Sequence, residues 1–186
     1  LSAPKNSNLK TVMDFSFFEK VNTMKYEETD PYSTGLNRIY NSFVYDFLYP
    51  NPAMVLAFYE NHDTNRYLGE GQDLQTLKQA VALLLTTRRI PQLYYGTEVM
   101  MNGVKDKSDG YVRKDFPGGW MDDKENALTS AGRSQIQNEC FNFYRTFLQW
   151  RKGNDVIAKG DMVQFMPQQG VYVFARMYQG TTVMVL

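Results

Sequence analysis

The sequence has very few cysteine and histidine residues. Its 186 residues include one of each, Cys140 and His62. A single cysteine excludes an intramolecular disulfide, and the helix-like residues around Cys140 offer no nearby base to activate a thiol. We therefore expect Cys140 to be a small buried residue. No acidic cluster has the ligand spacing of a dedicated calcium loop, so the sequence assigns no metal site and no cofactor.

The sequence also lacks a net charge and a long apolar run. Lys and Arg number 20 together, as do Asp and Glu. The chain therefore has no excess positive charge whose electrostatic field would hold nucleic acid or an anionic membrane surface. No segment is long enough to span a bilayer, and the first residues have no signal-peptide core. We expect no nucleic-acid or membrane partner, and the compartment stays open between periplasm and cytoplasm. The absence of an initiator methionine suggests a processed or truncated chain.

The composition otherwise fits an ordinary globular chain. Hydrophobic residues make up 43% and charged residues 22%, which is enough to bury a sizeable core. Aromatic residues reach 15%. Their rings fill cores, and they also stack on the apolar faces of carbohydrates.

Short apolar segments alternate with helical patterns along most of the chain. Residues 11–15, 54–59 and 90–95 read as strands, and each is followed by a helix-like stretch, near 36–48, 74–85 and 130–150. This order predicts a parallel sheet with right-handed crossovers, either open or part of a barrel. No glycine-rich phosphate loop follows the first strand, which argues against nucleotide binding. The long polar loop 102–129 is of a length that is usually functional or disordered.

The pattern changes after Gly153. Short segments around 162–165 and 170–176 and the final run 181–186 alternate with turn residues, as in antiparallel strands. We predict two domains, with the α/β part at residues 1–155 and the beginning of an all-β domain at residues 156–186. The last run ends inside an expected strand, so we expect that domain to be cut short.

Polar residues at the end of the second predicted strand mark the candidate site. The apolar run 54–57 leads into Phe58-Tyr59-Glu60-Asn61-His62-Asp63. Side chains at the carboxyl ends of parallel strands gather at the site edge of a sheet or barrel. There an aspartate can face a developing positive charge while the imidazole binds a hydroxyl. In the alternative interpretation, Asn61 and Asp63 open a turn and cap the next helix, and His62 is a packing residue.

Three motifs in order resemble the α-amylase family, glycoside hydrolase family 13. Phe58 to Arg66 is similar to its short region with the pattern Phe, two variable residues, Asn-His-Asp. Residues 90–98 resemble its eighth barrel strand, and residues 112–120 resemble the following loop of neopullulanase and cyclomaltodextrinase members. The resemblance implies an α/β fold that is the C-terminal part of a (β/α)8 TIM barrel, about its last three βα units, followed by the start of an antiparallel β C-terminal domain.

The resemblance also implies roles for individual residues. Retaining glycosidases use a nucleophile and a proton donor about 5 Å apart. In this family these follow the fourth and fifth strands, which the chain lacks. Asp63 matches the third family carboxylate, which binds sugar hydroxyls and stabilises the transition state, and His62 matches the histidine that contacts the same sugar. We predict that the chain alone is inactive.

Further candidates have a functional and a structural interpretation each. Arg66 could orient Asp63 through a bidentate pair, or it could be a surface arginine. Glu98 could line the cleft or cap a helix. Arg113, Asp115 and Trp120 lie in the long loop, where Trp120 could stack on outer sugars or simply pack. Asp14 matches no catalytic position and reads as structural.

The sequence thus predicts part of a retaining hydrolase of α-linked glucans, with starch, maltooligosaccharides, cyclodextrin or pullulan as substrate classes. The alternatives are a non-catalytic glucan-binding or regulatory fragment and an unrelated α/β enzyme. Calcium could still bind the complete protein. Because three strands leave sheet edges open, we expect further segments or a second copy of the chain to pair with them.

Overall fold

The computed structural model describes residues 9–24, 35–71 and 73–186. The chain forms two compact units. The first unit contains residues 1–59, 83–92 and 150–186, and the second contains residues 60–82 and 93–149. The long helices α3 (Leu74–Thr86) and α5 (Gln135–Lys152) contribute residues to both units. The predicted domain boundary near residue 155 stays a prediction.

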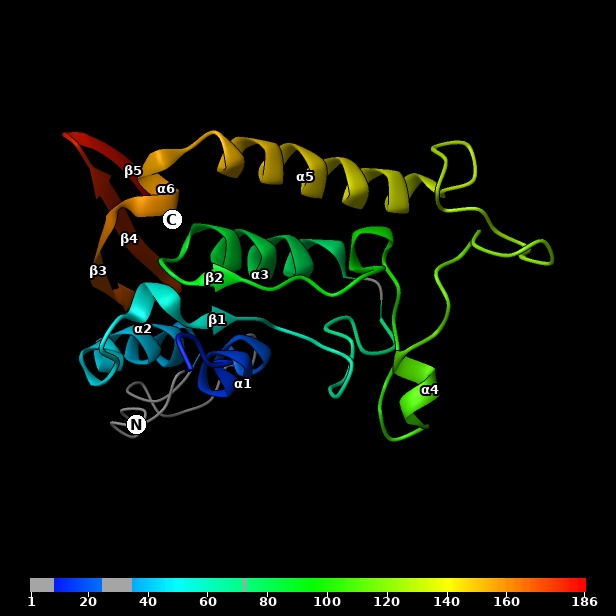
Figure 1. The fold of residues 1–186 in the computed structure, drawn as a ribbon, viewed down its shortest axis with the longest axis horizontal. Helices are drawn as coiled ribbons and strands as arrows, with labels where there is room; N and C mark the ends of the chain where they lie inside the picture. The colour runs from blue at the N-terminus through cyan, green and yellow to red at the C-terminus, as the bar shows by residue number, and fades with distance from the viewer. Residues whose placement is uncertain (1–8, 25–34, 72) are drawn as a thin grey trace. The chain divides into compact units, whose positions relative to one another are not determined.

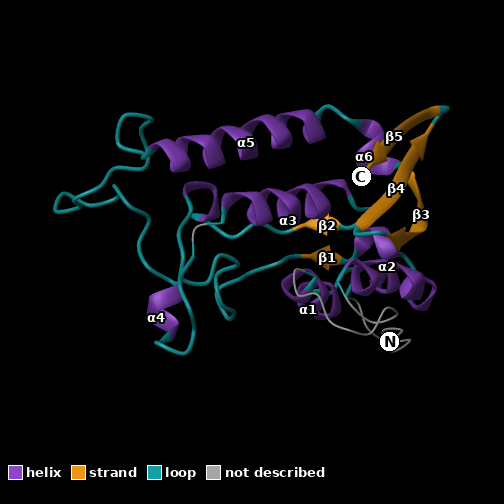
Figure 2. Cartoon of the chain, turned by 180° about the vertical axis from the view of Figure 1, so that it is seen from behind, coloured by secondary structure: helices purple, strands orange, loops and turns teal. Residues whose placement is uncertain are grey.

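Three extended segments run parallel in the first unit. Strand β1 (Leu56–Ala57) pairs with β2 (Ile90–Pro91), and Met13 forms a single parallel bridge to Leu56 on the other side. Figures 1 and 2 show β1 and β2 side by side. The order of the segments is the one predicted, because each helical crossover returns the chain in the same direction. The complete barrel stays a proposal.

The paired segments are shorter than the predicted strands, and local capping explains why. Asp14 turns its side chain back to accept the amide of Phe17 at 2.8 Å, so helix α1 (Phe15–Thr23) begins where the first strand was expected to continue. Asn51 caps the 3-10 helix η2 (Pro52–Met54) in the same way. Pro91 is tolerated in β2, because the ladder bonds come from the amides of Ile90 and Gln92 on either side.

The first unit also contains a three-stranded antiparallel sheet, and antiparallel strands are what the sequence after Gly153 predicted. Its strands are β3 (Asp161–Gln168), β4 (Val171–Tyr178) and β5 (Thr181–Val185), in that order across the sheet. The buried Arg176 ties this sheet to its surroundings by donating to the carbonyls of Thr86 and Gly160, both at 2.7 Å. The sheet packs on helices α2 (Leu36–Val44) and α6 (Asp155–Lys159). Helix α2 continues into the 3-10 helix η1 (Tyr45–Leu48).

The second unit consists of helices and ordered loops. Its short elements are the 3-10 helix η3 (Thr97–Val99) and helix α4 (Asp109–Val112). Ser134 begins α5 through reciprocal hydrogen bonds with Gln137. The core contains Cys140, which is fully buried as predicted, together with Leu77, Val81, Val99, Val112 and Tyr144. No described helix combines the length and the apolar character that a membrane crossing requires.

Candidate functional site

The candidate site is a tight turn that directly follows Tyr59 in the chain. Asn61 is buried, and its side-chain oxygen accepts the amide of Asp63 at 2.8 Å. The amide of Asn61 in turn donates to the hydroxyl of Thr64 at 2.9 Å. These two bonds form an Asx-type turn. Asn61 therefore opens a turn, as the alternative interpretation predicted for it, and the turn fixes the backbone that carries His62 and Asp63.

The two residues at the tip of this turn present their side chains to solvent. His62 is 61% exposed and Asp63 is 55% exposed, and the distance from His62 Nε2 to Asp63 Oδ2 is 3.2 Å. His62 is therefore not a packing residue. On the other carboxylate oxygen, Arg113 Nη2 lies 2.8 Å from Asp63 Oδ1. The carboxylate thus sits between an imidazole and a guanidinium, with its open side toward solvent, where a ligand hydroxyl can reach it.

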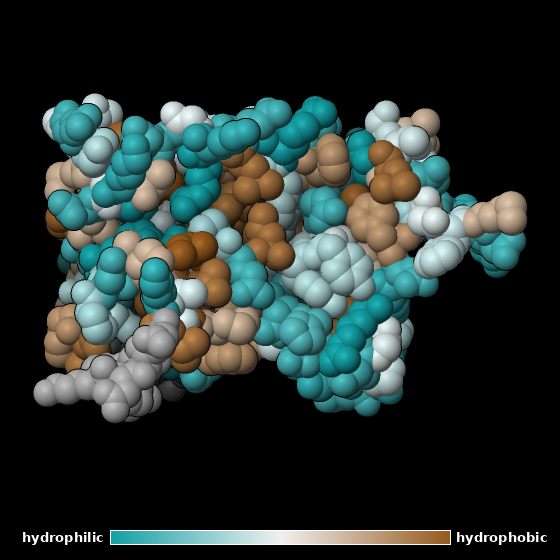
Figure 3. Space-filling view, in the orientation of Figure 1, coloured by the Kyte–Doolittle hydropathy of each residue, from teal (hydrophilic) through white to brown (hydrophobic). Residues whose placement is uncertain are grey.

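The segment from Gly103 to Arg113 holds the turn from one side. Arg113 Nε donates to the carbonyl of His62 at 2.8 Å, and Lys105 Nζ donates to the carbonyl of Asp63 at 2.9 Å. The amide of Lys105 also donates to the side chain of Asn65 at 2.6 Å. Asp109, in helix α4, shares Arg113 Nη2 at 3.0 Å. The surface over α4 is mostly hydrophilic in Figure 3, which fits a charged segment that faces water.

Arg66 occupies a different place from the one predicted. Its side chain is 0% exposed, and its Nη1 lies 4.0 Å from Glu60 Oε1. The guanidinium donates to the carbonyls of Val112 and Tyr95 and lies 4.0 Å from the centre of the Tyr94 ring. The predicted orientation of Asp63 by Arg66 is therefore corrected, since Arg113 forms that ion pair. Nor is Arg66 a surface arginine, because burial is offset here by cation–π contact and carbonyl acceptors.

Glu60 is the buried carboxyl group at the start of the turn. It accepts the amide of Tyr67 at 2.6 Å and the hydroxyl of Thr97, so it joins the two ends of the segment 60–67 to each other and to η3. Burial raises the pKa of Glu60 to about 7, and this effect outweighs the lowering by the Tyr67 amide and by Arg66. The side chain fixes the loop from inside and is only 1% exposed.

The two remaining predicted site residues lie on other segments of the second unit. Glu98 is partly buried in the first turn of η3, where Gly96 occupies the N-cap position, so Glu98 lies within the helix and does not cap it. Trp120 is 67% exposed in the long loop, where its amide donates to Asp123 at 2.9 Å. Its ring is accessible for stacking. The roles of Glu98 and Trp120 in binding a substrate stay predictions.

Sequence reasoning gave too little weight to two residues of this site. The sequence does not distinguish Arg113 from its loop neighbours Asp115 and Trp120, although all three lie within residues 112–120, which resemble a family loop. Glu60 lies inside the family motif at a variable position, and no periodic signal distinguishes a buried glutamate there. Among the described residues, no group of three or more histidine, cysteine, aspartate or glutamate side chains could hold a metal ion, and the calcium question stays open.

Comparisons with known proteins find similarity to proteins named cyclomaltodextrin glucanotransferase and α-amylase. Residues 162–186 match the family described as cyclo-malto-dextrinase C-terminal domain. The chain is 28% identical over 180 residues to cyclomaltodextrin glucanotransferase from Thermoanaerobacterium thermosulfurigenes, covering 97% of this chain and 22% of that protein. It is 28% identical over 173 residues to α-amylase from Niallia circulans, covering 93% of this chain and 29% of that protein.

The solved structures that resemble this chain include an α-amylase, as the sequence relatives do. The crystal structure of α-amylase from Geobacillus thermoleovorans, complexed with acarbose, superposes with a TM-score of 0.72 at 21% identity, over 95% of this chain and 36% of that chain. The resemblance to the α-amylase family is thus confirmed, and the chain has the fold of one part of such a protein. It spans less than a third of the length of the two curated relatives above.

Proposed function

We propose that this chain is part of a retaining α-glucan hydrolase of the α-amylase type, with Asp63 as the carboxylate that stabilises the transition state. The observation that supports this most directly is the exposed Asp63 carboxylate, held between His62 at 3.2 Å and Arg113 at 2.8 Å. A fixed negative charge favours an oxocarbenium-like transition state without bonding to it. In this proposal the parallel segments near Met13, β1 and β2 are the last three strands of a β/α barrel.

The neighbouring residues have supporting roles in the proposal. The imidazole of His62 contacts a hydroxyl of the same sugar, and Glu98 and Trp120 contact the substrate further out, Trp120 by stacking. Arg66 acts through the fold of the turn, because its buried guanidinium donates to the Val112 carbonyl next to Arg113. Arg113 is a positioning residue for Asp63. Neopullulanase- or cyclomaltodextrinase-like substrates, such as cyclodextrin or pullulan, are the proposed class.

The nucleophile and the proton donor belong to strands that this chain does not contain, so the chain alone should have no hydrolase activity. The test uses the complete enzyme that includes this segment. We expect Asp63→Asn to lower kcat on maltooligosaccharides by roughly 10²-fold or more, because the charge facing the transition state is lost. The matched control is Asp155→Asn, which removes an aspartate of similar exposure, 66%, that pairs with Lys159 on the surface.

Two results would contradict the proposal. One is hydrolysis of maltooligosaccharides or cyclodextrin by the 186-residue chain alone at an ordinary enzymatic rate. The other is an equal effect of Asp63→Asn and Asp155→Asn on kcat. The sequence upstream of Leu1 separates the hydrolase from a glucan-binding fragment. An aspartate and a glutamate at the ends of two further strands favour the hydrolase, and their absence favours the binding protein.

A further inference from the structure

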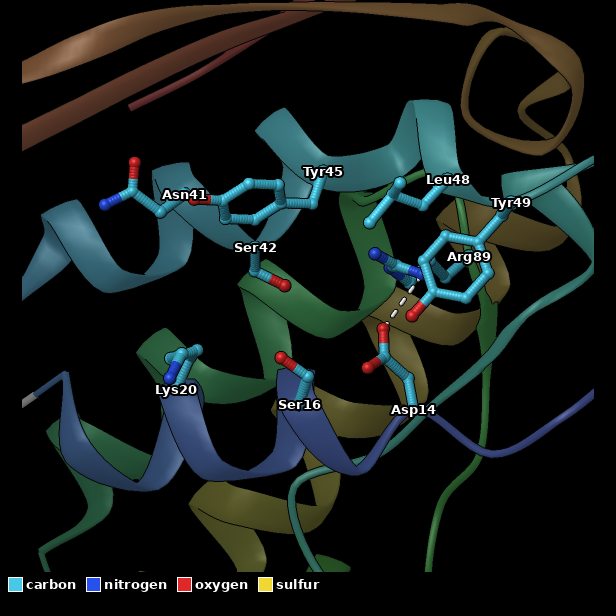
Figure 4. A pocket seen from close by; sticks show the side chains of 9 residues that line it. All are labelled: Asp14, Ser16, Lys20, Asn41, Ser42, Tyr45, Leu48, Tyr49 and Arg89. Carbon is cyan, nitrogen blue, oxygen red and sulfur yellow. Dashed lines mark ion pairs between the residues drawn. The ribbon is translucent and has the colours of Figure 1, made fainter. Parts of the chain in front are cut away.

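A second site-like feature lies in the first unit, on residues that take no part in the candidate site. It is a cavity of about 310 Å³ between α1, α2 and η1, shown in Figure 4. This volume corresponds to roughly ten water molecules and lies at the small end of ligand pockets. Nine residues line it: Asp14, Ser16, Lys20, Asn41, Ser42, Tyr45, Leu48, Tyr49 and Arg89.

Charged side chains that are almost fully buried line this cavity. Asp14 is 4% exposed and Arg89 is 2% exposed, and they form an ion pair with Arg89 Nη1 at 2.8 Å from Asp14 Oδ2. Within the described residues, neither of these two atoms makes a well-aligned hydrogen bond, and Arg89 Nε makes none either. Because these atoms have almost no accessible surface, the ion pair stabilises the wall of the cavity, and contacts to a ligand come from the other groups that line it.

The cavity walls carry neutral hydrogen-bonding groups and aromatic rings. Ser16 and Lys20 lie one turn apart on α1, and Ser42 points toward them from α2, whereas the side chains of Asn41 and Tyr45 lie along α2 (Figure 4). Hydroxyl and amide groups both donate and accept, as the vicinal hydroxyls of a sugar require. Tyr45, which is 57% exposed, and Tyr49 add ring faces of the kind that stack on pyranose rings.

The charge balance at the cavity favours a neutral ligand over an anion. Arg89 is already paired with two carboxylates, Asp14 at 2.8 Å and Asp46 at 2.6 Å. The ammonium of Lys20 lies 3.5 Å from the carboxylate of Glu19. Every cation at the cavity thus has an acidic neighbour, which leaves no surplus positive charge to hold phosphate or a carboxylate ligand.

We propose that this cavity is a binding site for a neutral sugar, of the size of one hexose unit or the end of a short glucan. The hydroxyls of Ser16 and Ser42 and the Asn41 amide contact vicinal hydroxyls of the sugar, and the ring of Tyr45 covers one face of it. Because this site uses none of the residues of the turn 60–66, it stands or falls separately from the proposed function.

The test is a titration of the 186-residue chain with glucose and with maltose, followed by backbone amide NMR. We expect saturable shifts at Ser16, Asn41, Ser42 and Tyr45. Asn41→Leu removes the amide and Tyr45→Ala removes the ring, and each should weaken binding about tenfold or more, which corresponds to about 1.4 kcal/mol. Phe47→Ala is the matched control, because Phe47 is a 76% exposed aromatic on the same 3-10 helix that does not line the cavity.

Circular dichroism should show the same helix content in all three variants. The proposal is overturned if neither sugar gives saturable shifts at the cavity, or if inorganic phosphate moves the same amides and the sugars do not. It is also overturned if Phe47→Ala weakens binding as much as Tyr45→Ala. Sugar-dependent shifts confined to His62 and Asp63 would refute the cavity site while leaving the proposed function intact.

Discussion

At the scale of single residues, the candidate site depends on one exposed and one buried carboxyl group that are three positions apart. Asp63 is 55% exposed and pairs with Arg113, whereas Glu60 is 1% exposed and holds the loop ends together. The exposed fraction of each carboxyl group therefore decides its role. The exposed carboxylate is available to a ligand, and the buried one determines where the exposed one stands.

Glu60 should make the stability of the chain depend on pH. Its pKa rises from 4.5 to about 7 on folding, so the native state binds more protons than the unfolded state between these values. Stability should therefore fall as pH rises through this window. We expect the free energy of unfolding in urea to decrease from pH 5 to pH 8, and Glu60→Gln to flatten this decrease, because the amide keeps the acceptor for Tyr67 without the charge.

The control for this prediction is Glu139→Gln, which changes a 53% exposed glutamate that pairs with Lys78. It should leave the slope of unfolding free energy against pH nearly unchanged. Equal slopes in the unchanged chain and in Glu60→Gln would contradict the assignment of the raised pKa to Glu60.

At the scale of elements, two of the three predicted helices begin where they were predicted, at Leu36 and Leu74, whereas the third begins at Gln135 instead of near residue 130, and helix α1 was not predicted. Asp73 directly precedes the predicted helix 74–85 and is a typical N-cap residue, and it caps α3 by accepting the amides of Gln75 and Thr76, at 3.0 and 3.1 Å. Capping is a local event within four residues, so sequence alone reveals it. Strand length depends on how far the partner segment stays in register. The cap at Asp14 ends the first segment early, and the 3-10 helix capped by Asn51 delays the start of β1.

Gly160, at the junction of α6 and β3, should tolerate no side chain. A Cβ there would lie 2.3 Å from the Val156 carbonyl oxygen and 2.8 Å from that of Met177, which are both backbone atoms. We expect Gly160→Ala to lower the free energy of unfolding by roughly 1–3 kcal/mol, because the helix and strand must separate. Chemical denaturation measures this change.

Gly110→Ala in α4 is the matched control, since its Cβ would meet nothing nearer than Ser108 Oγ at 3.8 Å. Alanine is the better helix former, so this variant should be neutral or slightly stabilising. Equal destabilisation by the two substitutions would show that the close approach at Gly160 is not the cause.

At the scale of the whole molecule, the antiparallel sheet has an incompletely covered face. Val163, Ala175 and Met184 are cross-strand neighbours on it. Exposure on this face reaches 42% for Val163, 52% for Phe165, 40% for Met177 and 56% for Met184. An apolar sheet face of this kind normally packs against a second layer.

The isolated chain should therefore self-associate through this face. We expect light scattering to show an average mass that rises with protein concentration, and Phe165→Lys to reduce this rise. Gln168→Lys adds the same charge on the same strand without removing an apolar ring, so it should have a smaller effect. A monomer at all concentrations, or an equal response to both substitutions, would contradict this prediction.

The sequence alone determined the order of the three parallel segments, the antiparallel strands after Gly153, the burial of Cys140 and the position of the motif around Asp63. These features depend on local periodicity, capping and short motifs, which neighbouring residues specify. The tertiary structure decided which cation meets Asp63, because Arg113 is 50 residues away in a loop without periodicity. It also decided the burial of Glu60 and Arg66 and the cavity between α1 and α2, since long-range packing sets exposure and pairing.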